Sequence, residues 1–242
     1  MVDTRPGTGY EVGVHGPRDI QAGLVGGDVD RRVNSSRVPP LDLNHVIAPF
    51  RRPSDEEALR AFLWEAPVHV EIGFGRAHHI CGLAEGEPTL HVLGFETKRP
   101  WCRGAARRAE RLGLANLRVI EGDARPYMQR LLPDGCVQMV HVLFPDPWWK
   151  RRHHKRRLFS ETFVESVHRL LAPGGTLVTK TDVAPYADLI EEALGTHAGF
   201  SLAATTSLDP VLAALPLSHR EKKCRELGIS VFQYRYVKEI GT

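Results

Sequence analysis

The chain has 242 residues, a formal net charge of +3 at pH 7 and a 42% share of hydrophobic residues. These values fit a globular domain with its own core, and they exclude a chain whose total charge alone would attract nucleic acid. The four cysteines form no C-x-x-C pair, which argues against a zinc ribbon or a disulfide framework and fits a reducing cytoplasm. No stretch resembles a membrane span or a signal peptide, so we expect a cytoplasmic protein with no membrane partner.

The composition changes near residue 45. Residues 1–45 are rich in Gly, Asp and Arg without helical or strand periodicity, and they are predicted to form a disordered or loosely packed tail. Residues 46–242 show no internal repeat and are predicted to form one domain. Its first helix is expected to begin with Ser54 as N-cap, because Glu57 follows three residues later as in a capping box, and to run to about Trp64.

From residue 68 onward, strand-like and helix-like segments alternate. The expected strands cover residues 68–72, 90–95, 117–120, 137–144, 176–180, 200–206 and 231–237. The expected helices cover residues 78–84, 100–113, 126–132, 161–171 and 185–195. Residues 173–175 are expected as a turn and residues 218–227 as a connection. This alternation predicts an α/β fold with a mostly parallel sheet and helices on both faces.

Acidic residues stand at or beside the ends of the first four predicted strands. Ligands bind at this edge of such a sheet, and Gly73 and Gly75 allow a ligand to approach the backbone closely. The third glycine of a dinucleotide-binding turn is missing, because Arg76 and Ala77 follow Gly75. An acidic rim also favours a positively charged cofactor without phosphates, such as S-adenosylmethionine, over a nicotinamide dinucleotide. The four acids are Glu71, Glu96, Asp123 and Asp146.

Residues 144–157 read F-P-D-P-W-W-K-R-R-H-H-K-R-R, directly after an apolar strand. Pro145 and Pro147 fix their own φ and bias the residues before them toward extended backbone. Aromatic faces beside a dense group of cations indicate a place to hold a base and its phosphates, although a solvated basic face is the alternative. The adjacent histidines at 153 and 154 lack the i, i+4 spacing of helical metal ligands, so no metal site is predicted.

These motifs resemble those of the tRNA (guanine-N7-)-methyltransferases, from about residue 68 to the C-terminus. The resemblance is carried by E-I-G-F-G at 71–75, G-F-E at 94–96, G-D-A at 122–124, the segment 144–157 and T-D at 181–182. It implies a Rossmann-like class I methyltransferase fold and methyl transfer from S-adenosylmethionine to N7 of a guanine in the tRNA variable loop. It also implies that the four strand-end acids bind the cofactor. The substrate-binding positions it implies are Lys150, Asp182, Ser218 and Glu221.

The chain departs from the family pattern at several positions. Ala77 replaces a usual glycine, Trp149 replaces a proline, and residues 218–221 read Ser-His-Arg-Glu where the family has Thr-x-[Phe/Tyr]-Glu. The cofactor half therefore matches more closely than the substrate half. A small purine-like or heteroaromatic substrate is therefore the alternative to tRNA. The sequence leaves open whether the protein is a monomer or a homodimer.

The chemistry of guanine N7 limits what the protein must supply. N7 carries a free lone pair, so its methylation requires alignment of the reactants rather than a strong base. The product purine is positively charged, and a fixed carboxylate beside it would stabilise that charge as it develops. Asp146, between its two prolines, is the predicted catalytic residue, with Asp182 as the second candidate. Trp148 is expected either to stack on the base or to pack in the core.

Overall fold

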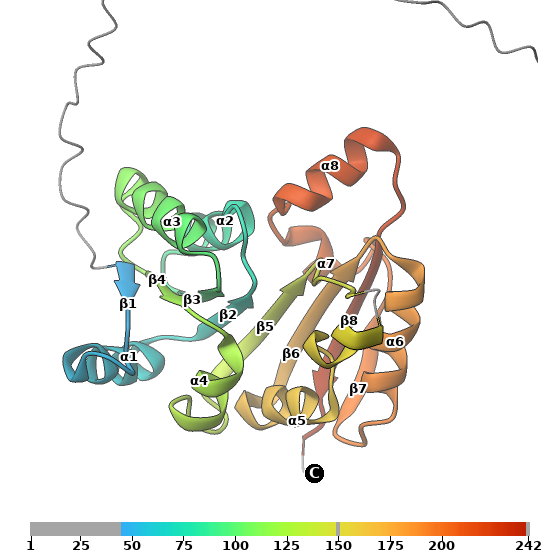
Figure 1. Ribbon diagram of the computed structural model, residues 1–242, viewed down its shortest axis with the longest axis horizontal. Coiled ribbons are helices and arrows are strands. Elements are labelled where there is room, and N and C mark those ends of the chain that lie inside the picture. The colour runs from blue at the N-terminus through green and yellow to red at the C-terminus, as the bar shows by residue number, and fades with distance from the viewer. Residues whose placement is uncertain (1–44, 149–150, 241–242) are drawn as a thin grey trace, which may run out of the picture. The chain divides into compact units, whose positions relative to one another are not determined.

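The computed structural model describes residues 45–148 and 151–240, which all belong to one compact unit, Pro39–Thr242 (Figure 1). The predicted N-terminal tail lies outside the described residues except for His45. Lys150 and Trp149 lie outside them as well. In the part of the chain that is described, no helix is long and apolar enough to cross a membrane.

The described residues form one eight-stranded sheet, with the strand order β1-β4-β3-β2-β5-β6-β8-β7. All neighbouring pairs from β1 to β6 are parallel, and β8 runs antiparallel to both β6 and β7. The predicted mostly parallel sheet is therefore confirmed. The strands are β1 (Val46–Ile47), β2 (Val68–Ile72), β3 (His91–Glu96), β4 (Leu117–Glu121), β5 (Val137–Leu143), β6 (Leu171–Thr181), β7 (Phe200–Ala204) and β8 (Phe232–Lys238).

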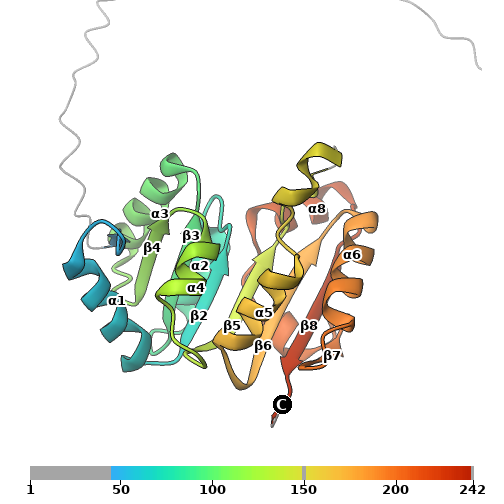
Figure 2. The same cartoon turned by 60° about the horizontal axis from the view of Figure 1, so that its bottom comes forward.

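Helices cover both faces of this sheet (Figure 2). The first face is covered by α1 (Pro53–Glu65), α4 (Ala124–Arg130), α5 (Glu161–Leu170) and α6 (Ala184–Gly195). The second face is covered by α2 (His78–Gly86), α3 (Arg99–Leu112), α7 (Pro210–Ala214) and α8 (His219–Leu227). A 3-10 helix, η2 (Arg151–Arg156), follows β5.

The two faces of the central strands differ in polarity. Val68, Val70 and Ile72 of β2 belong to the large apolar core under the first group of helices. Successive side chains of a strand point to opposite faces, so His69 and Glu71 lie under the second group. The second face therefore carries buried polar groups next to the strand ends where a ligand is expected.

Four local expectations were wrong. Helix α1 begins one residue before Ser54, at Pro53, and has no side-chain cap, because a proline in the first turn already fixes φ and has no N–H to satisfy. Residues 219–227 form a helix rather than an irregular connection. The turn at 173–175 is an irregularity inside β6, where Val137 pairs with Leu171 and Met139 with Thr176. Phe144 has a left-handed φ of 54° instead of an extended one.

Candidate active site

The strand order reverses at β2, which has β3 on one side and β5 on the other. The crevice at such a switch point is where α/β sheets bind ligands. A cavity of about 550 Å³ lies there. Its lining comes from the turns after β2, β5 and β6, the end of β3, the start of α3, η2 and the start of α8. The cavity is therefore built from segments that are far apart in the sequence.

Glu96 organises the glycine turn after β2. Its Oε2 accepts a hydrogen bond of 3.0 Å from the Gly75 N–H, while its Oε1 accepts one of 2.9 Å from the Lys98 N–H. Gly75 has a φ of 53°, and a Cβ built there would lie 3.0 Å from the ring of Trp101. A side chain at Gly75 would therefore intrude on the aromatic wall of the cavity.

Glu71 is almost fully buried, although it lines the cavity. Its Oε2 lies 3.1 Å from Nδ1 of His79 on α2. Behind this pair lies His141 of β5, whose Nε2 is 3.3 Å from Nδ1 of His69. Burial, with the nearby His79, lowers the pKa of His69 to about 4 and holds the pKa of His141 well below its usual value. His69 and His141 are therefore neutral near pH 7, and His79 is the histidine that faces the Glu71 carboxylate.

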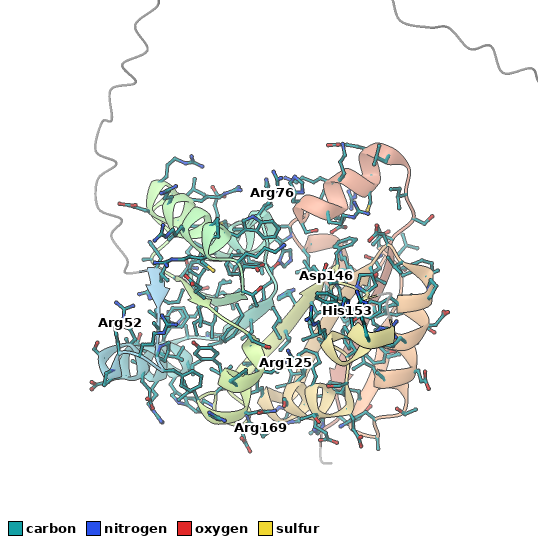
Figure 3. The ribbon with its side chains drawn as sticks, viewed as in Figure 1. Arg52, Arg76, Arg125, Asp146, His153 and Arg169 are labelled. Carbon is teal, nitrogen blue, oxygen red and sulfur yellow. The ribbon has the colours of Figure 1, made fainter. Side chains whose placement is uncertain are left out.

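Asp146 lies on the turn after β5, exposed and at the cavity (Figure 3). The turn is bounded by two non-glycine residues in left-handed backbone, Phe144 and Trp148, a conformation that costs about 1–3 kcal/mol each. It is held by Arg157, whose Nε donates to the Pro147 carbonyl at 2.9 Å, and by Arg156, whose guanidinium lies 5.0 Å from the Trp148 ring. Asp146 therefore sits on a turn that is held by left-handed backbone and by two arginines, and not by extended residues before the prolines.

Asp123 is placed differently from the other strand-end acids. It caps α4, and its carboxylate oxygens accept hydrogen bonds of 2.5–3.0 Å from the Arg125 guanidinium. Partial burial acts against ionisation, but the hydrogen bonds and charge of Arg125 keep the pKa of Asp123 below its usual value. Asp123 is not among the residues that line the cavity. The structure thus groups Glu71, Glu96 and Asp146, while Asp123 stands apart.

Of the predicted substrate-binding residues, some line the cavity and others do not. Asp182 and Ser218 both line the cavity, where Asp182 pairs with Arg220. Ser218 caps α8, since its Oγ accepts the Glu221 N–H at 3.1 Å. The Glu221 side chain instead points into the protein and bonds Lys180 of β6. Lys150 lies outside the described residues.

Several cavity residues were not singled out from the sequence, among them Thr97, Lys98 and Trp101. Trp101 carried a usable signal. It follows Pro100 in the first turn of a helix that begins just after a strand end, which is the edge where ligands bind. His219 lies between Ser218 and Glu221, two positions that the resemblance assigned to substrate binding, and it does line the cavity.

Solved structures of methyltransferases share the fold of this chain. The 16S rRNA methyltransferase KamB superposes with a TM-score of 0.55 at 19% identity, covering 78% of this chain and 94% of that chain. The antibiotic-resistance methyltransferase Kmr superposes with a TM-score of 0.53 at 18% identity, covering 77% and 94%. At this level of identity the likeness concerns the fold alone. The chain has the Rossmann-like fold of the class I methyltransferases, as predicted.

Sequence relatives define the family. A family model described as putative methyltransferase matches residues 65–234. The tRNA (guanine-N(7)-)-methyltransferase of Sodalis glossinidius is 36% identical over 72% of this chain and 74% of its own length, and that of Cronobacter sakazakii is 34% identical over 83% and 78%. The enzyme of Escherichia coli K12 is 35% identical over 71% and 72%. The chain belongs to the tRNA (guanine-N7-)-methyltransferase family, which confirms the resemblance found in the sequence.

Proposed function

We propose that this protein transfers a methyl group from S-adenosylmethionine to N7 of a guanine in tRNA, in the variable loop. The observation that carries the proposal is the exposed Asp146 carboxylate at the switch-point cavity, on a turn held in left-handed backbone at both ends. Family membership supports both the reaction and the substrate class, because the curated relatives named above are tRNA (guanine-N(7)-)-methyltransferases.

The residues present fit S-adenosylmethionine. Glu71 and Glu96 give the cavity an acidic floor that suits a cationic cofactor, and Gly75 leaves the space beside Trp101 that a side chain would fill. Helix α2 begins at the glycine turn without a side-chain cap, so its first N–H groups favour a carboxylate. When bound, the cofactor supplies an electrophilic methyl group on a sulfonium.

Each acid has a role in this proposal. Glu96, held by backbone N–H groups at the end of β3, would bind the ribose hydroxyls. Glu71, backed by His79, would balance positive charge of the cofactor. Asp123 would contact the adenine while it shares its carboxylate with Arg125.

Asp146 would act on the substrate. Guanine becomes positively charged as N7 is methylated, and a carboxylate already fixed beside the base stabilises that charge without reorganisation. Trp148, beneath Arg156, offers an aromatic face on which the base can stack. Ser218 and Asp182 lie at the same cavity and would orient the nucleotide, while the cations of residues 150–157 would bind its phosphates.

The test is methyl transfer from labelled S-adenosylmethionine to unmodified tRNA, followed by nucleoside analysis. We expect N7-methylguanosine with the wild type and a kcat roughly 100- to 1000-fold lower with Asp146→Asn. Asp188→Asn, an exposed acid of α6, is the matched control and should behave like the wild type. Cofactor binding without labelled tRNA would overturn the proposal, and transfer to a small heteroaromatic compound would then support the alternative substrate.

A further inference from the structure

A row of cations leads away from the cavity over α3 and α8. We call it the basic band and define it as Arg76, Arg108, Arg111 and Lys222. Arg76 lines the cavity and lies between α2 and α8 (Figure 3). Among the described residues, no salt bridge includes any of these four side chains. Several other cations of the same two helices do have partners, such as Arg220 with Asp182 and Arg99 with Glu121.

Packing brings the members of the band together. Helix α2 lies between α3 and α8 (Figure 1), and it packs closely on the segment before α8, since a Cβ at Gly82 would lie 2.8 Å from Pro216. On α3, Arg108 lies seven residues after the cavity residue Trp101, which places it on the same face about 10 Å further along the axis. The band therefore begins at the cavity and continues on one side of the protein.

His78, at the first turn of α2, lies inside this group of charges. Its ring is 5.3 Å from the ring of His219, centroid to centroid. Burial first, and then the positive charges of Arg108 and Lys222, with smaller effects of His219 and Arg76, lower the pKa of His78. The ring contact places the start of α2 beside the start of α8, and charges from the glycine turn, α3 and α8 all act on the His78 side chain.

The charge of α3 is poorly balanced within the helix. Its sequence, Arg99–Leu112, contains five arginines and a single acid, Glu110. Arg108 and Arg111 are three residues apart, and like charges at this spacing destabilise a helix by a few tenths of a kcal/mol. Burial raises the pKa of the Cys81 thiol on α2, Arg108 and Arg111 lower it, and Glu85 raises it. Glu85 therefore offsets part of the positive charge of the two arginines at this thiol. A bound polyanion would relieve the remaining repulsion.

We infer that the basic band binds the phosphate backbone of the RNA whose target base enters the cavity. The inference rests on the proposed tRNA substrate and adds a contact surface separate from η2 and the segment that contains it. Two surfaces on different parts of the rim, with Asp146 at the cavity between them, would fix the RNA in two places and orient the base.

The test compares two double variants that remove equal charge. Arg108→Ala/Arg111→Ala alters the band, and Arg60→Ala/Arg130→Ala removes two exposed helical arginines from α1 and α4. Alanine is a good helix former, so both double variants should fold. Their melting temperatures and their affinities for S-adenosylmethionine check this. tRNA affinity is measured by filter binding from 50 to 200 mM salt, together with KM and kcat.

We expect the band variant to bind tRNA about 10-fold more weakly at 50 mM salt. The slope of log affinity against log salt should fall by roughly 1.5, because two phosphate contacts are lost. Its KM for tRNA should rise while kcat and cofactor affinity stay unchanged. An affinity and slope equal to those of the control variant would overturn the inference.

The outcomes also separate this inference from the proposed function. If the wild type methylates tRNA and both variants match it, only the basic band is refuted. If the wild type binds tRNA without methylating it, and the band variant loses affinity and slope, the band stands and the proposed reaction fails. If the wild type binds no tRNA, both fail.

Discussion

The Nζ of Lys180 donates hydrogen bonds to both carboxylate oxygens of Glu221, at 2.9 and 3.1 Å, and both side chains are almost fully buried. Lys180 belongs to β6 and Glu221 to α8. The pair therefore ties the sheet to the helix whose start, at Ser218, reaches the cavity. Helix α8, which the sequence pattern did not predict, is thus held at the cavity by a buried ion pair.

We expect Lys180→Met to lower the free energy of unfolding by about 3 kcal/mol, because it leaves the buried Glu221 carboxylate with only the longer contact to the exposed Arg225, at 3.4 Å. Chemical denaturation at pH 7 measures this change. The double variant Lys180→Met/Glu221→Leu should recover most of the stability, since neither charge then remains. A cost below about 1 kcal/mol for the single variant would show that water or another group compensates Glu221.

The same double variant tests whether Glu221 contacts substrate. If Glu221 acts only as a structural tie, the stable double variant should keep most of the wild-type kcat/KM for tRNA. If it also binds the nucleotide, as the resemblance implies, kcat/KM should fall although stability is restored. Asp182→Asn, at the cavity itself, should lower kcat/KM in either case.

Gly75→Ala should weaken S-adenosylmethionine binding about 10-fold, which corresponds to about 1.4 kcal/mol. The new methyl group would be strained at a φ of 53° and would press on the Trp101 ring at 3.0 Å. Isothermal titration calorimetry measures the affinity. Gly113→Ala is the matched control, because its φ of 66° brings similar strain, its Cβ would meet no atom within 4 Å, and it does not line the cavity. Equal losses in both variants would show that space beside Trp101 does not limit binding.

Stability should fall as the pH drops from about 6.5 toward 4. His69 has a pKa of about 4 in the folded protein, well below that of an unfolded histidine, so between these values the unfolded chain binds more protons. The contribution of His69 is therefore complete above pH 6.5 and is lost toward pH 4, with a limiting slope of about 1.4 kcal/mol per pH unit. The groups that face His69 are His141 and His79, with Glu71 behind them.

Urea unfolding at pH 7.0, 5.5 and 4.5 measures this slope. His69→Gln should reduce it. The pKa of Asp123 lies below its usual value, so that carboxylate loses its own contribution only at still lower pH. A slope for His69→Gln identical to that of the wild type would exclude the buried ring as its source.

The sequence by itself determined the alternation of strands and helices. Local signals act within a few residues, so Val68–Ile72 was predicted to the residue and Gly113 was correctly expected near the end of α3. Acids at successive strand ends pointed to the edge of the sheet where the cavity lies, because parallel strands bring their carboxyl ends together. The motif at 144–157 was specific enough to indicate the family.

Tertiary structure alone decided which of these residues meet. Asp123 bonds Arg125 and does not line the cavity, although it follows a strand end as Glu71 and Glu96 do. Phe144 took a left-handed φ although it precedes a proline, at a place where its N–H donates to the Lys180 carbonyl of β6 at 2.7 Å. Helix α8 forms at the cavity because Glu221 finds Lys180, 41 residues earlier in the chain. Pairings across such distances depend on the whole fold, and no local pattern of residues specifies them.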